Sequence, residues 1–167
     1  MLRWLTEKIS SAAPEEGTLL EQTVRAQMDD VEGAKIVAAI AGLLGTVAYA
    51  DRRYEAIEEH RIRQELARVH GLTAAGVDAI CTVLRQHIVE ISTVEAPVYA
   101  RELLALADKD LRLEVLDALV DLAAADDEIT VDETNVLRLA ATALGLTQHD
   151  YNTAQSRHRE KLKVLHK

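Results

Sequence analysis

Five carboxylates within eight residues are the part of this sequence best suited to chemistry. They are Asp126, Asp127, Glu128, Asp132 and Glu133. Carboxylate oxygens are the ligands that Ca²⁺, Mg²⁺ and Mn²⁺ prefer, so this acidic turn is a candidate site for one divalent cation. The turn is not an EF-hand, because valine and leucine occupy the sixth and twelfth positions counted from Asp126.

The same residues also have a purely structural explanation. Thr130 and Glu133 have the spacing of a capping box, in which the hydroxyl and the carboxylate satisfy free backbone N–H groups at a helix start. Asp132 then lies near the N-terminus of that helix, where the helix dipole favours a negative charge. The acidic turn is therefore either a cation site or an acidic surface that caps a helix.

A weaker copy of the acidic turn stands 75 residues earlier in the chain, where residues 50–58 parallel residues 125–133. Arg52 and Arg53 follow the aspartate in this first copy and partly neutralise its acids. We therefore expect any cation at the second turn and not at the first. If the two copies pack about a pseudo-twofold axis, these arginines could face the acids of the second turn as weak surface ion pairs.

Both acidic turns lie between predicted helices that follow one another in the same order. A helix lined with small residues precedes each turn, an amphipathic helix follows it and ends at a glycine, and a threonine caps the next helix. These helices are expected over residues 33–50, 55–70 and 73–91 in the first copy and over 111–125, 130–144 and 147–165 in the second. We predict two superposable three-helix units, about residues 33–91 and 111–163, joined by a helix over residues 96–107 with Pro97 in its first turn.

The composition predicts an all-α fold. Of 167 residues, 49% are apolar, phenylalanine is absent and aromatic residues make up only 3%, so alanine and leucine must fill the core. Such a core suits closely packed helices better than a sheet, and two prolines and seven glycines leave few helix breakers. We expect one compact bundle of about seven to eight helices.

The chain divides into a short N-terminal part and one domain. We assign residues 18–167 to the helical domain, which would begin with a helix over residues 18–31, and residues 1–17 to an amphipathic segment and its linker. In that segment Leu2, Leu5 and Ile9 share one helical face, and Trp4 lies beside it. Because a helix this short does not fold alone, it must dock on the bundle, on a partner or on a membrane. These three alternatives stay open.

Charge and motif content argue against several function classes. A net charge of −9 repels phosphate backbones, so nucleic-acid binding is not expected, whereas cations and basic partners are favoured. The sequence has no i,i+4 histidine pair, nucleophile elbow, phosphate-binding glycine loop or dinucleotide fingerprint, so we expect no enzyme. The single cysteine, Cys81, fits a buried thiol in a reducing cytoplasm. The longest uncharged run, residues 36–50, is short for a bilayer span, so we expect no integral membrane protein.

The two turns resemble the hallmark of the TerB family of bacterial tellurite-resistance proteins. That hallmark is an Ala-Asp-Gly turn, a hydrophobic residue two positions later and a glutamate four beyond that. The matching residues are Asp126, Ile129 and Glu133 and, more weakly, Asp51, Tyr54 and Glu58, and the resemblance covers roughly residues 33–163. The glycine of the family is replaced by Asp127 in the second turn and by Arg52 in the first. A positive φ at this position would suit aspartate better than arginine.

The resemblance implies a role in bacterial stress response, divalent-cation binding through acidic residues and membership of membrane-associated complexes, without enzymatic activity. We interpret the chain as an interaction module of a stress-response assembly, whose acidic face or terminal helices bind a protein partner. The alternative is a dedicated binding protein for Ca²⁺, Mg²⁺ or Mn²⁺ whose ion is integral to its function. Metal-dependent stabilisation would separate the two. We expect the protein in the cytoplasm, with attachment to the inner membrane and the oligomeric state left open.

Overall fold

The computed structural model describes residues 17–126 and 128–158 of the chain. Its helices, in chain order, are α2 (Leu19–Arg25), α3 (Val31–Ala48), α4 (Ala56–Leu66), α5 (Ala74–Glu90), the π-helix η1 (Ile91–Glu95), α6 (Ala96–Leu106), α7 (Lys109–Ala123), α8 (Val131–Ala143) and α9 (Gln148–Ser156). No β-strand is present within these two ranges, so the all-α prediction is confirmed. The expectations for residues 1–16 and 159–167 lie outside the described residues.

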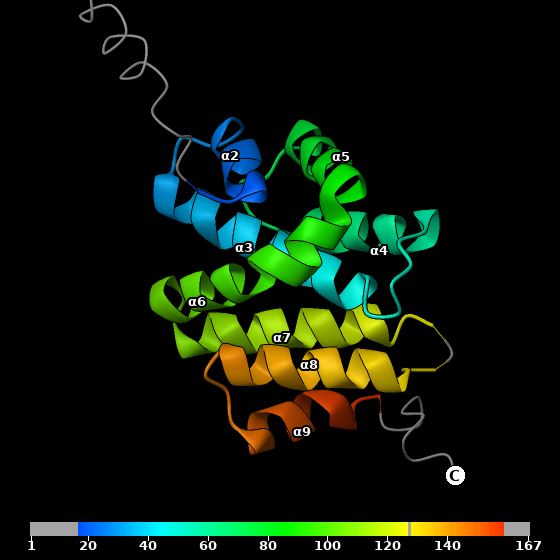
Figure 1. Cartoon of the computed structure of the whole chain (residues 1–167). Coiled ribbons are helices and arrows are strands. Elements are labelled where there is room, and N and C mark those ends of the chain that lie inside the picture. The colour runs from blue at the N-terminus through cyan, green and yellow to red at the C-terminus, as the bar shows by residue number, and fades with distance from the viewer. Residues whose placement is uncertain (1–16, 127, 159–167) are drawn as a thin grey trace, which may run out of the picture.

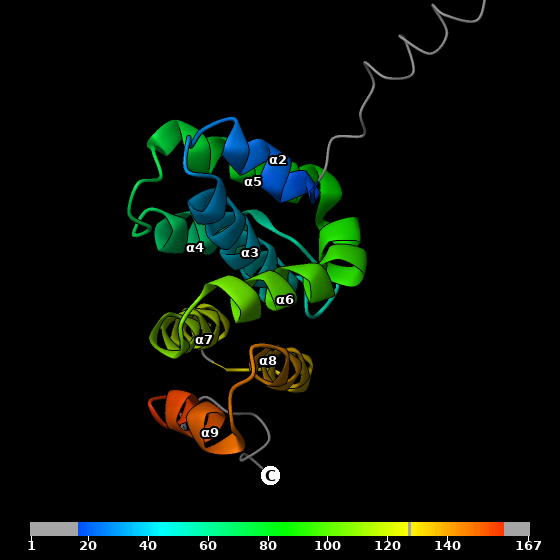
Figure 2. The same ribbon diagram turned by 90° about the vertical axis from the view of Figure 1, so that its left-hand side faces the viewer.

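Helix α3 is the centre of the bundle. It contacts α2, α6 and α7 most extensively, and α4, α5 and α8 also pack on it. Figures 1 and 2 show α2, α4 and α5 on one side of α3, and α7 and α8 on the other, with α9 beneath them. The largest fully buried side chains include Leu44 of α3, Tyr99 of α6 and Leu116 of α7, so the core runs between these layers.

The small residues predicted in α3 allow its neighbours to approach the helix backbone. A Cβ atom at Gly42 would lie 2.3 Å from Cδ2 of Tyr99, which means that the tyrosine ring of α6 packs directly on α3. By length and composition, with a mean hydropathy of 1.6, α3 would be apolar enough to cross a membrane. In this bundle, however, 56% of it is buried against other helices, as is typical of a core helix.

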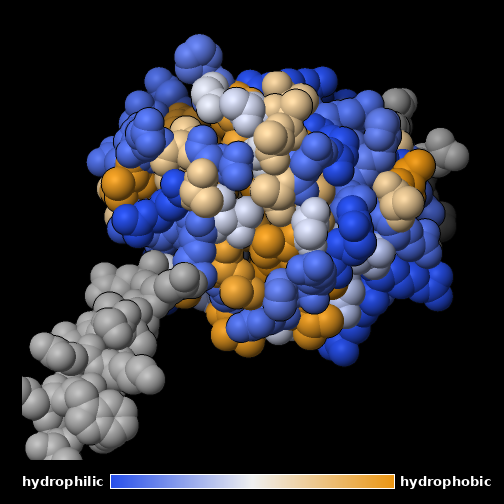
Figure 3. Space-filling view, turned by 90° about the horizontal axis from the view of Figure 1, so that it is seen from above, coloured by the Kyte–Doolittle hydropathy of each residue, from blue (hydrophilic) through white to orange (hydrophobic). Residues whose placement is uncertain are grey.

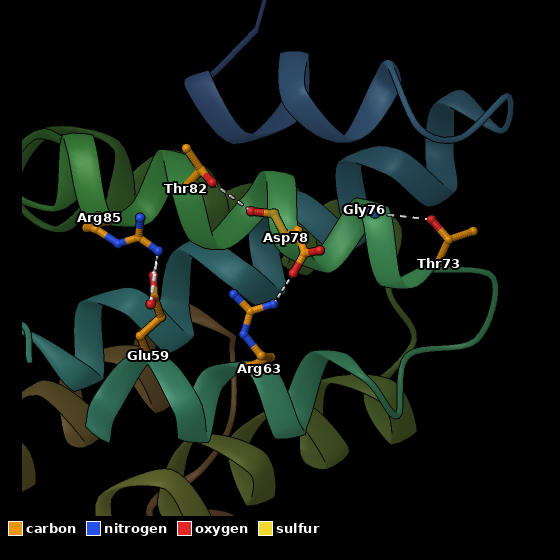
Figure 4. Close-up of polar contacts among 7 residues, drawn as sticks. All are labelled: Glu59, Arg63, Thr73, Gly76, Asp78, Thr82 and Arg85. Carbon is orange, nitrogen blue, oxygen red and sulfur yellow. Dashed lines mark hydrogen bonds and ion pairs between the residues drawn. The ribbon is translucent and has the colours of Figure 1, made fainter. Parts of the chain in front are cut away.

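Two ion pairs between side chains join α4 to α5 (Figure 4). Arg63 of α4 pairs with Asp78, and Nη2 of Arg85 lies 2.8 Å from Oε1 of Glu59. The predicted N-cap of α5 is confirmed, because Oγ1 of Thr73 accepts a hydrogen bond from a backbone N–H in the first turn. Partly exposed pairs of this kind contribute about 0–1 kcal/mol each, so they orient α4 more than they stabilise it.

Several predicted helix ends are wrong by a few residues. The helix predicted over residues 18–31 ends at Arg25, and α3 begins after the N-cap residue Asp30. The helix predicted to reach residue 70 ends at Leu66, and the chain then forms tight turns up to Gly71. Helix α7 begins two residues earlier than predicted, because the side chain of Asp108 accepts a hydrogen bond from the N–H of residue 111 at 2.8 Å.

The segment between α5 and α6 differs from the prediction of two separate helices. The chain stays helical throughout, and η1 joins the two helices after a non-helical φ of −129° at His87. Such π-helical turns are often found at functional sites. Glu95, the last residue of η1, is buried, and its Oε2 accepts hydrogen bonds from the N–H of Leu19 at 3.0 Å and from the hydroxyl of Tyr99 at 3.3 Å.

The two predicted three-helix units occur in the expected order, as α3, α4 and α5 and as α7, α8 and α9. Gly71 and Gly145 occupy equivalent positions and have φ values of +84° and +69°, the left-handed conformation that glycine supplies after a helix. The superposition of the two units stays a prediction. The apolar residues Ile57 and Ile62 of α4 predict one core face, but Ile57 is 52% exposed, because it lies about 140° around the helix from the buried Ile62.

Candidate functional site

The two acidic turns face each other in the fold. We call the meeting place the acidic junction and define it as Asp51, Glu58, Arg61, Asp126 and Glu133. All but Asp51 line a small cavity of about 10 Å³, whose remaining walls come from the last turns of α3 and α7. Asp51 and Asp126 are 75 residues apart in the sequence, and so are Glu58 and Glu133. The fold therefore brings equivalent positions of the two turns together. A cavity of this size is about the space that one water molecule needs.

Capping boxes position two of the four carboxylates. Oε2 of Glu133 accepts a hydrogen bond from the N–H of Thr130 at 2.8 Å, and Oγ1 of Thr130 accepts one from the N–H of Glu133 at 3.1 Å, so the predicted capping box is confirmed. The equivalent glutamate, Glu58, accepts from the N–H of Glu55 at 2.7 Å, and α4 also begins with a capping box. This second box was not predicted, although Glu55 and Glu58 stand 75 residues before Thr130 and Glu133 and have the same spacing.

Arg61 brings a positive charge into the junction. Its Nη2 lies 2.7 Å from Oδ1 of Asp126, although the two residues are 65 positions apart in the sequence. The side chain of Arg61 is only 18% exposed, and its hydrogen bond to Asp126 raises the pKa of the guanidinium. Asp126 is thus paired by α4, and not by Arg52 or Arg53 as the sequence analysis considered.

The environment of Glu133 disfavours the charged form of its carboxyl group. Burial raises the pKa of its carboxyl group, and the neighbouring charges of Asp126 and Asp51 raise it further, while the capping hydrogen bonds with Thr130 lower it. The junction therefore concentrates more negative charge than one guanidinium neutralises, and the charged form of Glu133 is disfavoured there.

The structure places the five predicted ligands of a cation in different situations. Asp126 and Glu133 lie together in the junction, Glu128 and Asp132 are exposed and do not line its cavity, and Asp127 lies outside the described residues. In the described part of the chain no group of three histidine, cysteine or acidic residues is arranged to hold a metal ion. The cation site stays a prediction.

A comparison with protein-family models shows to which family the chain belongs. A family model described as "Tellurite resistance protein TerB" matches residues 37–156, a range that contains both acidic turns and the helices around them. The chain belongs to the TerB family. Neither the curated proteins nor the solved structures contain a match to it.

The first turn departs from the TerB pattern in a way that the backbone makes visible. Arg52 stands at the position of the family's glycine and adopts a φ of +64°. This left-handed conformation is unfavourable for a residue with a Cβ atom, whereas glycine adopts it freely. The position therefore does require a positive φ in the first turn, and the arginine is strained there.

An apolar groove is the second notable feature of this TerB domain. It has a volume of about 400 Å³ and lies between α3, the η1–α6 segment and α8, with no charged residue in its walls. Leu139, on the rim, is 71% exposed, which is the largest exposure among the large hydrophobic residues described. A further hollow of about 240 Å³ shares Thr46, Ser92, Thr93 and Val136 with the groove and extends it towards the first turn. The sequence does not reveal the groove, because Val136, Leu137, Ala140 and Leu144 of α8 have the spacing of a single core face. In the structure Val136 and Ala140 line the groove.

Proposed function

We propose that this chain is a non-enzymatic interaction module of the tellurite-resistance type, which holds an amphipathic helix of a protein partner in the apolar groove. The observation that carries the proposal is the groove itself, whose uncharged walls leave Leu139 71% exposed on the rim. Grooves of this kind bind helices through apolar side chains spaced at i, i+3, i+4 and i+7.

The charge of the chain indicates what such a partner looks like. With a net charge of −9, the protein attracts basic segments and repels acidic ones. The partner helix therefore has an apolar face flanked by lysine or arginine. Membership of the TerB family supports a place in a cytoplasmic stress-response assembly.

Cross-linking in cells tests this function. A photoreactive amino acid at position 143, in the wall of the groove, should capture a partner, whereas one at position 149, an exposed position of α9, should not. Leu139→Lys should abolish the capture from position 143, because it places a charge on the rim of the groove. Ile57→Lys is the matched control, since Ile57 is also an exposed hydrophobic residue but does not line the groove. Capture that survives Leu139→Lys, or equal capture from position 149, would contradict the proposal.

A second candidate function is the binding of a divalent cation at the acidic junction. It is favoured by the four carboxylates and by the raised pKa of Glu133, since a cation would relieve their mutual repulsion. Arg61 already supplies one positive charge at the same place, so a cation has to compete with its guanidinium. Asp126 and Glu133 would hold the ion in the junction, and the predicted ligands Glu128 and Asp132, which are exposed and do not line its cavity, would have to turn towards it.

Titration of Ca²⁺, Mg²⁺ and Mn²⁺ against thermal unfolding tests this candidate. A ligand at 100 times its dissociation constant stabilises the folded state by about 2.7 kcal/mol, which is a shift of roughly 5–10 °C for a chain of this size. The shift should be larger in Arg61→Met, where the competing guanidinium is removed, and should disappear in Asp126→Asn and Glu128→Gln. A shift that persists in both of these variants places the ion elsewhere, and no shift in the native protein or in Arg61→Met leaves the junction as a helix-capping surface.

A further inference from the structure

We propose that residues 2–9 of this chain occupy the apolar groove in the free protein, so that a partner has to displace them. The inference rests on the proposed function only in taking the groove as the binding surface. It adds an occupant within the same molecule, and with it a means of regulation, because the binding surface is covered until a competing helix arrives.

The first argument is where the described chain begins. The N–H of Leu19, in the first turn of α2, donates a hydrogen bond to Oε2 of Glu95 at 3.0 Å. Glu95 lies at the end of η1, directly between Thr93 and Ala96, which both line the groove. Gly17 is two residues from this contact, so the chain enters the bundle beside the η1–α6 wall of the groove. Figure 2 shows the start of α2 on the same side of the molecule as η1 and α6.

The second argument is reach. Six residues lie between Ser10 and Gly17, so the chain takes seven steps of at most about 3.3–3.6 Å from one to the other, or roughly 23–25 Å in all. Helix α6, which forms one wall of the groove, has 11 residues and is therefore about 16 Å long. The linker is thus longer than this wall of the groove, so its length permits residues 2–9 to lie in the groove.

The third argument is the match of chemistry. Leu2, Leu5 and Ile9 lie at i, i+3 and i+7, which is the spacing of the side chains that anchor a helix in a groove. Val89, which lines the adjoining hollow, is 57% exposed, so the apolar surface continues beyond the groove. In Figure 3 hydrophobic surface reaches the edge of the molecule close to where the described chain begins.

Tethering favours this occupant over a second copy of the chain. A short flexible linker gives a tethered segment an effective concentration in the millimolar range. A contact that would be weak between separate molecules is therefore mostly formed within one molecule, and a second copy at micromolar concentration cannot compete with it. A partner helix has to bind more tightly than the tethered segment to open the groove.

Tryptophan fluorescence tests the contact in the full chain, because Trp4 is the only tryptophan and reports on this segment alone. In the native protein Trp4 should be shielded from acrylamide, and the shielding should not change on dilution. Leu139→Lys should expose it, lowering the ratio of docked to free segment at least about tenfold, which corresponds to about 1.4 kcal/mol. Ile57→Lys should leave the quenching unchanged. Circular dichroism of both variants checks that the bundle still folds, as the exposure of both side chains leads us to expect.

Four results would overturn the inference. The first is unhindered quenching of Trp4 by acrylamide in the native protein, and the second is shielding of Trp4 that Leu139→Lys does not alter. The third is shielding that is lost on dilution and therefore belongs to a contact with a second copy. The fourth is shielding that appears only when lipid vesicles are added.

Cross-linking keeps this inference separate from the proposed function. If Trp4 is shielded through Leu139 but no partner is captured from position 143, even after removal of residues 2–10, the intramolecular contact stands and the partner proposal fails. If a partner is captured while Trp4 is free, the reverse holds.

Discussion

Substitution of Gly42 by alanine is the sharpest test of how α3 packs against α6. These two helices also form two walls of the groove. An ideal Cβ atom at Gly42 would lie 2.3 Å from Cδ2, 2.5 Å from Cε2 and 2.8 Å from Cγ of Tyr99. The tyrosine has no room to retreat, because it is fully buried and its hydroxyl donates to Glu95. The helices must therefore move apart.

The magnitude follows from two opposing contributions. Overpacking of a core costs about 1–3 kcal/mol, and a contact with a rigid buried ring belongs at the upper end of that range. Alanine in a helix interior is about 1 kcal/mol more favourable than glycine. Gly42→Ala should therefore lower the free energy of unfolding by about 2 kcal/mol, which is a fall in Tm of about 4–8 °C.

Gly45→Ala, one turn further along the same helix, is the matched control. Its Cβ would lie 2.7 Å from Cδ2 of Leu84, which is the far end of a flexible side chain and can rotate away. The gain in helix propensity should then nearly cancel the cost of packing. Urea unfolding of the two variants measures the difference as a change of midpoint at constant slope. Equal stabilities of the two variants would refute the direct packing of Tyr99 on α3 as the reason for the glycine.

Three further predictions concern the turns and helix ends. Arg52→Gly should raise the free energy of unfolding, measured with urea, by up to about 1 kcal/mol. The reason is that relief of the left-handed φ of Arg52 outweighs the conformational entropy that glycine loses on folding. Arg53→Gly, the control, should not raise the free energy of unfolding. Glu133 has a raised pKa in the folded state, so its contribution to stability is complete below its ordinary value of 4.5 and is lost as the pH rises through the folded pKa. Glu133→Gln keeps the capping hydrogen bond without titrating, so its stability relative to the native protein should increase with pH above about 4.5 in urea titrations, and a constant difference would contradict this. Arg112→Met should lower the unfolding free energy by about 1–3 kcal/mol, because Nη1 of Arg112 donates to the carbonyl of Leu144 at 2.7 Å, and an unchanged urea midpoint would show that solvent replaces this bond.

The features that the sequence determined by itself are the local ones. The capping box at Thr130, the N-caps at Thr73 and Thr147 and the left-handed Gly145 after α8 lie where the sequence predicts them. Gly71 is also left-handed, but α4 ends at Leu66, five residues before it. Each depends on hydrogen bonds or backbone angles within about four residues, so the sequence alone contains their cause. The all-α fold follows in the same way from an alanine- and leucine-rich composition with few helix breakers.

Tertiary structure alone decided what lies between elements that are distant in the sequence. Arg61 meets Asp126 across 65 residues, and Glu95 receives the N–H of Leu19 across 76 residues. Helix propensity contains no information about either contact, because both depend on how whole helices are placed against one another. The same is true of the groove: Val136 has the spacing of a core residue of α8 in the sequence, and only the packing of α8 against α3 and α6 places it in the groove wall, with Leu139 71% exposed beside it.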